Sequence, residues 1–170
     1  MNSRHVLPLR PINARTLGLF FGAALAGVLA GCGPSAPPAA AVPDKSVTIT
    51  ANDDMKFDVS TIEAKPGQKL IITLKDVGST PKFSMGHNFT VLNKGTNVNK
   101  FIEAGAEHAA NSYLDPAMKG NIIATTKLLG PGESDTITFK APMVPAEYDF
   151  VCTFPGHYAV GMKGKLIVAP

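Results

Sequence analysis

Residues 152–162 read Cys152-Thr153-Phe154-Pro155-Gly156-His157-Tyr158-Ala159-Val160-Gly161-Met162. This stretch supplies a thiol, an imidazole and a thioether, with four residues between each of these groups and the next. Strand-like segments flank it at Tyr148–Val151 and Lys165–Val168. Two histidines, one cysteine and a weak axial methionine form the ligand pattern of an electron-transferring blue copper centre. The stretch therefore predicts a metal-binding loop between two neighbouring β-strands.

Such a centre needs a second histidine, and Met85-Gly86-His87-Asn88 is the obvious donor, just before the strand-like Phe89–Leu92. Each residue alone has an ordinary interpretation: His87 as a turn or core histidine, Cys152 as a buried thiol, and Met162 as core filler. Together they complete the donor set in the required strand context. We therefore predict that His87, Cys152, His157 and Met162 bind one copper ion.

Short β-rich segments separated by glycine and proline turns dominate the chain from residue 45 onward. Further strands are expected at Val47–Thr50, Lys69–Leu74, Ile122–Thr125 and Asp135–Phe139. Their spacing predicts an all-β fold, a two-sheet antiparallel β-sandwich with Greek-key connections. Helix-like apolar spacing over Val98–Ser112 predicts a short helical flap on the outside of the sandwich.

The first 44 residues are expected to lie outside the folded domain. Three arginines and the apolar run Leu17–Ala30 indicate a signal peptide over residues 1–31. Leu29-Ala30-Gly31-Cys32 resembles a bacterial lipobox, in which Cys32 is acylated and begins the mature chain. The alternative is a plain signal peptide with a chance cysteine. Residues 32–44 then form a Pro/Ala linker, and the domain spans 45–170.

Charge and cysteine content restrict the function further. The chain has 16 basic and 13 acidic residues, and three of the basic ones are arginines of the signal segment. The mature part is therefore formally neutral, which gives no support to nucleic-acid binding. With Cys32 acylated, Cys152 is the single remaining thiol of an exported protein, so burial or metal ligation must protect it.

Four segments of this chain resemble azurin, and the likeness covers essentially the whole of residues 45–170. They are Asp54–Phe57, Met85–Asn88, Thr126–Gly130 and Cys152–His157. Azurins have one residue fewer between the second histidine and the methionine. The longer loop and the lack of a disulfide make the chain more similar to auracyanin, an azurin-like cupredoxin.

The resemblance implies a cupredoxin-like fold and a role for each matching residue. Cys152, His87 and His157 would form the trigonal plane, with Met162 as the axial ligand and the Gly86 carbonyl opposite it. Asn88 and the backbone N–H of Phe154 would support these ligands from outside the copper sphere. Azurins often carry a non-ligand histidine where Asp76 stands here, so no histidine-based pH switch is expected at that position.

The expected function is that of a lipid-anchored electron carrier, not an enzyme. Its partners would be a donor and an acceptor redox protein, such as a cytochrome or a membrane redox complex, on the periplasmic side of a bacterial membrane. Gly33 after the lipidated cysteine favours the outer membrane. Electrons are expected to enter at His157, within an apolar docking collar made of Met55, Met85, Phe154, Pro155 and Tyr158. The rival function is copper storage or delivery with the same ligands.

Overall fold

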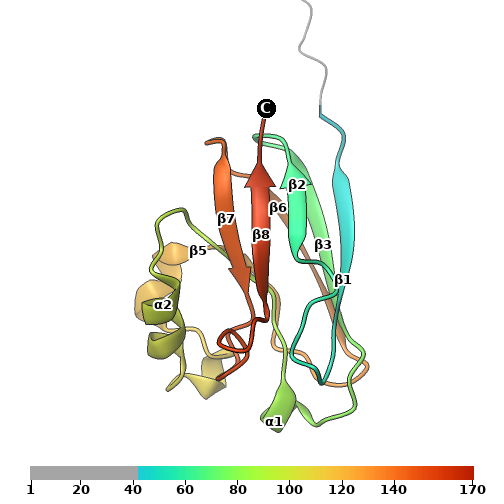
Figure 1. Cartoon of the computed structure of the whole chain (residues 1–170), viewed down its shortest axis with the longest axis vertical. Coiled ribbons are helices and arrows are strands. Elements are labelled where there is room, and N and C mark those ends of the chain that lie inside the picture. Colours follow the sequence, from blue (N-terminus) through green and yellow to red (C-terminus); the bar gives the residue numbers. More distant parts are fainter. Residues whose placement is uncertain (1–41) are drawn as a thin grey trace, which may run out of the picture. The chain divides into compact units, whose positions relative to one another are not determined.

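Two facing β-sheets form the part of the chain that the computed structural model describes, residues 42–170 (Figure 1). The strands are β1 (Lys45–Ala51), β2 (Thr61–Ala64), β3 (Lys69–Asp76), β4 (Thr90–Leu92), β5 (Ile122–Thr125), β6 (Ser134–Lys140), β7 (Ala146–Val151) and β8 (Lys163–Val168). The helical elements are α1 (Lys82–Met85), α2 (Val98–Gly105), and the 3₁₀ turns η1 (Ala109–Asn111) and η2 (Pro116–Asn121). The predicted signal peptide, Cys32 and most of the linker lie outside the described residues.

The sheets have the strand orders β1-β3-β6 and β2-β8-β7-β4-β5. The predicted all-β sandwich is confirmed, but purely antiparallel pairing is wrong. β1 pairs with β3, and β2 with β8, in parallel, whereas the remaining pairs are antiparallel. The cause is the connectivity: the chain crosses to the other sheet after β1 and returns after β2, so β1 and β3 run in the same direction.

The core lies between the sheets and comes from the alternation of side chains along the strands. In β3, Leu70, Ile72 and Leu74 are fully buried, while the residues between them face outward. Burial of each such side chain contributes about 1.5–3 kcal/mol. Phe89 and Phe150 pack at the centre, with ring centroids 4.8 Å apart. This core holds β4 and β7, which lead into the predicted ligand segments, in a fixed relation.

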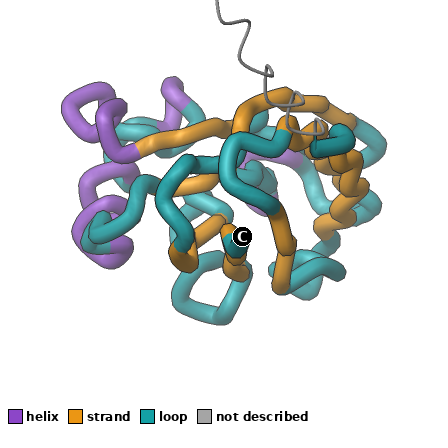
Figure 2. The backbone as a smooth tube through the Cα atoms, turned by 90° about the horizontal axis from the view of Figure 1, so that it is seen from above, coloured by secondary structure: helices purple, strands orange, loops and turns teal. Residues whose placement is uncertain are grey.

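The predicted flap is present on the outside of the larger sheet, but it is built from three short pieces (Figure 2). α2 begins at Val98, where the Asn97 side chain accepts a hydrogen bond from Lys100 N at 3.1 Å. It ends at Gly105, which packs closely against the backbone of Tyr113. Phe101 attaches the flap by packing in a second apolar cluster with Leu92 and Val151.

The β7–β8 link and the segment before β4 lie at the same end of the sandwich. β7 and β8 are antiparallel neighbours, and Thr90 of β4 pairs with Val151 of β7. Residues 42–44 and the end of β8 lie at the opposite end (Figure 1). Within residues 42–170, no helix is long and apolar enough to cross a membrane.

Candidate metal centre

The β7–β8 loop is closed by its own backbone, which fixes the predicted ligands. Cys152 N donates to Met162 O at 3.1 Å, and Met162 N donates to His157 O at 2.9 Å. The chain reverses at Gly156, whose φ of +86° is a conformation that glycine adopts without strain. The loop therefore presents Cys152, His157 and Met162 from one rigid turn.

His87 reaches the loop from the segment that precedes β4. A two-way backbone bridge holds it: His87 N donates to Leu129 O at 3.0 Å, and Leu129 N donates to His87 O at 2.7 Å. The helical turn α1 comes immediately before, with Met85 N donating to Pro81 O at 3.0 Å. The helical turn α1 and this backbone bridge together direct the His87 imidazole toward the interior at this end of the sandwich.

The side chains of His87, Cys152 and His157 converge, with one potential ligand atom from each lying within 4.8 Å of the others. Cys152 Sγ lies 3.5 Å from His157 Nδ1, and the two imidazole centroids are 5.0 Å apart. All three residues are buried. In the part of the chain from 42 to 170, no other group of three such residues gathers in this way.

The chemistry of this cluster fits a metal ion. Both ring nitrogens of His87 are buried and have no hydrogen-bond partner among residues 42–170, although buried polar atoms almost always have one. A cation bound to one of these nitrogens would remove the free-energy cost of burying that nitrogen without a partner. A thiol and two imidazoles are also the in-plane donors that copper takes in electron-transfer sites.

Burial sets the protonation states of these donors. It lowers the pKa of His157 to about 4, with a further contribution from His87, so the ring is a neutral ligand at neutral pH. Burial likewise lowers the pKa of His87, against the opposing charge of Asp76. The pKa of Cys152 rises to about 12, chiefly through burial, although the backbone N–H groups of Asn88 and Phe154 favour the thiolate. The thiolate therefore requires a cation beside it.

Asn88 connects the two ligand segments through a buried polar bridge. Its amide accepts a hydrogen bond from Thr153 N at 2.8 Å, and its Nδ2 donates to Thr153 Oγ1 at 2.7 Å and to Ser112 O at 3.2 Å. The bridge continues the β4–β7 pairing, in which Thr90 lies opposite Val151. It ties the residue after His87 to the residue after Cys152.

The predicted axial contacts come from Met162 and Gly86. Met162 is fully buried in the main core cluster with Cys152. The Gly86 carbonyl oxygen lies 4.0 Å from Cys152 Sγ. A side chain at position 86 would lie 2.7 Å from Lys82 O and 2.9 Å from Leu128 Cγ, so only glycine fits without displacing α1 or Leu128.

The residues of the predicted docking collar differ in exposure, and their docking role stays a prediction. Phe154 is buried and His157 is only 2 % exposed. The physical reason is stacking, because the Phe154 ring packs 4.6 Å from the His157 ring and 4.9 Å from that of Tyr113. Pro155 is exposed, whereas Met55, Met85 and Tyr158 are half-buried. Tyr158 packs beside the second apolar cluster, with Lys163 over its ring.

The sequence analysis did not identify several residues that help to position the ligand segments. These are Thr153, Ser112 and Leu129, which act through backbone or buried polar contacts and therefore have no sequence signature. Phe83, 84 % exposed on α1, was detectable as an aromatic residue two positions before Met85. Asp76 is buried with an unpartnered Oδ2, while its Oδ1 accepts a hydrogen bond from Gly78 N at 2.8 Å.

Comparison with known families shows that residues 43–169 match the one described as "Copper binding proteins, plastocyanin/azurin family". Azurin of Bordetella pertussis is 41% identical over 136 residues, which cover 78% of this chain and 87% of that protein. Outer membrane protein H.8 of Neisseria meningitidis serogroup B is 38% identical over 123 residues, or 71% of this chain. The match spans 66% of the length of that H.8 protein.

Solved structures of auracyanins have the same fold. Reduced auracyanin from Roseiflexus castenholzii superposes with a TM-score of 0.66 at 35% identity, covering 75% of this chain and 98% of that one. Auracyanin A from Chloroflexus aurantiacus gives a TM-score of 0.64 at 32% identity, with 73% and 98% covered. The predicted similarity to azurin and auracyanin is confirmed.

Proposed function

This chain belongs to the plastocyanin/azurin family of copper-binding proteins, and on that premise we propose that it is a lipid-anchored carrier of single electrons. Its copper site is of type 1, formed around the cluster of His87, Cys152 and His157. The observation that carries the proposal is the convergence of these buried donors, including a His87 ring without a hydrogen-bond partner in the described part of the chain. When bound, copper supplies a one-electron couple between Cu(I) and Cu(II).

The protein's contribution to electron transfer is rigidity. The ligands come from a loop closed by its own backbone and from a segment fixed by the Leu129 bridge. The buried Asn88–Thr153 contacts hold these two segments at one spacing. A site that keeps its ligands in place needs little rearrangement when its charge changes, which favours rapid transfer. A storage or delivery site would instead need ligands that exchange readily.

Met162 and the Gly86 carbonyl are proposed as the weak axial contacts. Met162 is buried beside Cys152, and the Gly86 oxygen faces the sulfur at 4.0 Å. The N–H groups of Asn88 and Phe154, which favour the thiolate form of Cys152, would stabilise the sulfur charge in the loaded site. Both segments thus contribute a ligand and a hydrogen-bond donor.

Electrons are proposed to enter and leave through the edge of His157. His157 directly follows the exposed Pro155-Gly156 turn in the chain, so a partner seated on that turn comes close to the copper ligand. Half-buried Met55 and Met85 and exposed Phe83 supply apolar surface at the same end. Small apolar contacts suit transient electron-transfer complexes with a donor and an acceptor redox protein.

The docking surface is tested by Met85→Lys, with Ala169→Lys, at an exposed position of the opposite end, as the control. We expect slower electron exchange with a redox partner for Met85→Lys, an unchanged rate for Ala169→Lys, and the same visible spectrum for both. Equal exchange rates for the two variants would remove Met85 from the docking surface.

Anchoring through acylated Cys32, facing the periplasm, is part of the proposal. It is supported by the lipobox-like Leu29–Cys32 and by the similarity to a protein named as an outer membrane protein. The outer membrane is the favoured site. Mass spectrometry of the protein from membranes of a bacterial host should show an acylated Cys32 at the mature N-terminus, and Cys32→Ser should abolish membrane retention. An unacylated mature chain beginning elsewhere would refute the anchor.

Visible absorption and EPR spectra of the copper-loaded protein test the central claim. We expect an intense thiolate-to-copper charge-transfer band, reversible voltammetry and slow loss of copper to a chelator. A colourless Cu(II) complex would contradict a type 1 site. A coloured protein that passes copper rapidly to an acceptor protein would instead favour the delivery function.

A further inference from the structure

Exposed apolar side chains gather at the end of the sandwich opposite the metal centre. Met143 and Val144 are 72 % and 58 % exposed in the β6–β7 turn, and Val42, where the described chain begins, is 39 % exposed. The remaining strongly exposed large apolar residues of the described part lie at the metal-centre end: Val77, Phe83 and Val160. The domain therefore has two exposed apolar surfaces, one at each end.

The backbone beneath Met143 and Val144 is fixed. Buried Tyr148 donates its hydroxyl hydrogen bond to Val144 O at 2.8 Å. Gly67 N donates to Ala141 O at 3.1 Å, and Ala141 N donates to Gln68 O at 2.8 Å, so the β2–β3 and β6–β7 turns are joined. The apolar side chains are thus displayed by an ordered support.

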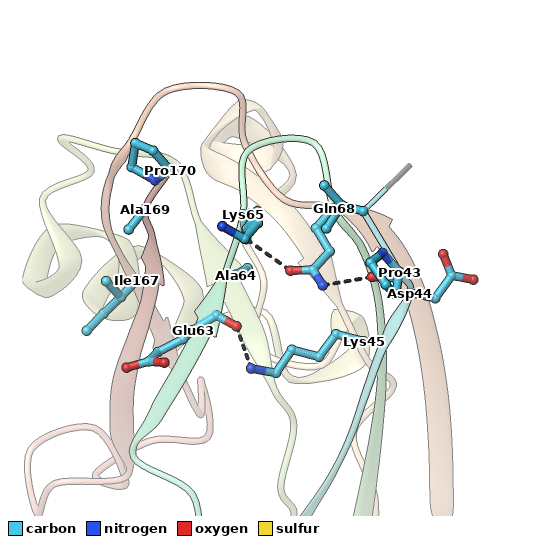
Figure 3. Close-up of a pocket in the computed structure, with 11 residues that line it drawn as sticks. Pro43, Asp44, Lys45, Glu63, Ala64, Lys65, Gln68, Ile167, Ala169 and Pro170 are labelled. Carbon is cyan, nitrogen blue, oxygen red and sulfur yellow. Dashed lines mark hydrogen bonds between the residues drawn. The ribbon is translucent and has the colours of Figure 1, made fainter. Parts of the chain in front are cut away.

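Charged side chains of both signs lie at this end. Lys69 is paired with Asp44 at 2.5 Å. Glu147 lies 3.8 Å from Lys165, whose nearer partner is Asp149 at 2.9 Å. Lys45 donates to the backbone oxygen of Glu63 at 2.6 Å, whereas the Glu63 carboxylate points away from Lys45 (Figure 3). Lys65 and Lys140 have no ion-pair partner within residues 42–170 and stand on either side of the joined turns. Two lysines at this end are therefore available to anionic groups, although the carboxylates of Glu63 and Glu147 lie at the same end.

The linker to Cys32 emerges from this same end. Pro43 O accepts a hydrogen bond from Gln68 Nε2 at 2.8 Å, beside a cavity that Lys45 and Gln68 help to line (Figure 3). Nine residues, 33–41, separate Cys32 from Val42. The ten Cα–Cα steps from Cys32 to Val42 span at most about 36 Å when fully extended. An acylated Cys32 therefore keeps this end of the sandwich within that distance of the lipid surface. The tether gives this end a high effective concentration at the lipid headgroups.

We propose that this surface, consisting of Val42, Lys65, Lys140, Met143 and Val144, docks on the anionic lipid surface to which the chain is anchored. The inference rests on the acylation of Cys32 in the proposed function. Apolar side chains insert into the headgroup region, and lysines are attracted to anionic lipids. Because β8 runs from the metal centre to this end, docking directs His157 away from the membrane. The carrier would then meet partners whose docking surface stands above the bilayer.

Fluorescence of the full acylated chain in vesicles of phosphatidylethanolamine and phosphatidylglycerol tests this orientation. The chain has no tryptophan, so Met143→Trp introduces a single reporter at the proposed surface. Phe83→Trp, at the other end, is the matched control. For each variant, emission is compared between vesicles with and without brominated acyl chains, so any quenching by copper cancels. We expect loss of emission for Met143→Trp and none for Phe83→Trp.

The charge contribution is measured by adding Lys65→Gln and Lys140→Gln to the Met143→Trp chain. Each lysine near an anionic surface contributes a factor of about five to binding, so the docked fraction and the quenching should fall accordingly. Equal quenching of Met143→Trp and Phe83→Trp overturns docking but not anchoring, and so does the absence of quenching in chains that co-float with the vesicles. Chains that do not co-float with the vesicles overturn both docking and anchoring. A missing blue absorption band contradicts only the carrier function.

Discussion

Replacing Asn88 with alanine would test whether a buried amide holds the two ligand segments together. The side chain makes two buried contacts to Thr153 and one partly buried contact to Ser112. In the variant, Thr153 Oγ1 still donates to Ser112 O at 2.9 Å, but Thr153 N loses its acceptor. An orphaned buried donor costs about 1–3 kcal/mol, and each lost hydrogen bond about 1 kcal/mol. We therefore expect a loss of about 3–5 kcal/mol of unfolding free energy.

Urea unfolding of the metal-free protein measures this loss, and Asn93→Ala is the matched control. Asn93 is exposed, and its amide donates only to Gly120 O, at 2.7 Å. Its removal should cost less than about 1 kcal/mol. The backbone N–H of residue 88 remains in the Asn88→Ala variant, so any change in the visible or EPR spectrum reports altered spacing of the ligand segments. Stability within about 0.5 kcal/mol of the parent, together with an unchanged spectrum, would refute the bridge as a positioning device.

Three further predictions address the metal centre. Gly86→Ala forces a shift of Lys82 or Leu128. We therefore expect it to destabilise the fold by about 1–3 kcal/mol in urea unfolding and to change the EPR spectrum. Unchanged stability together with an unchanged spectrum would contradict the crowding at position 86. Met162→Leu conserves side-chain volume but removes the thioether. Voltammetry should then show a higher reduction potential, because the cupric form loses a donor. An unchanged potential would argue against contact between Met162 and the copper. Because burial lowers the pKa of His157 to about 4 from 6.5, the unfolded chain takes up a proton first as the pH falls. Metal-free protein should therefore lose up to about 3 kcal/mol between pH 6.5 and pH 4, and a flat pH profile in urea unfolding would count against this burial.

The strands that the sequence predicted best are those with clear alternation or a continuous apolar run. The segment Lys69–Leu74 became β3, and Ile122–Thr125 became β5 with the same bounds. β2, Thr61–Ala64, was missed because it has a single large apolar side chain, Ile62, which does not mark it as a strand. The single turn α1 was missed because four residues are too few to show helical periodicity. Parallel pairing was not predictable either, since it depends on which sheet the chain enters after each strand.

The donor types and their spacing could be identified from the chain alone. Residue chemistry limits copper ligation to a few side chains, and Cys152, His157 and Met162 lie within one loop. What the sequence did not contain is the distance between that loop and His87, which stands 65 residues before Cys152. The β4–β7 pairing and the Leu129 bridge set this distance, because they are long-range backbone contacts.

Exposure was likewise decided by the tertiary structure. Phe154 and Phe83 are equally apolar in sequence, yet one ring is covered by Tyr113 and His157 while the other projects from a one-turn helix. The local pattern of this chain determined its β-rich class and its ligand chemistry, because both depend on residue type and short spacing. Only the folded sandwich determined which rings are covered, which nitrogens lack partners and which end carries the linker, because each depends on contacts between segments far apart in the chain.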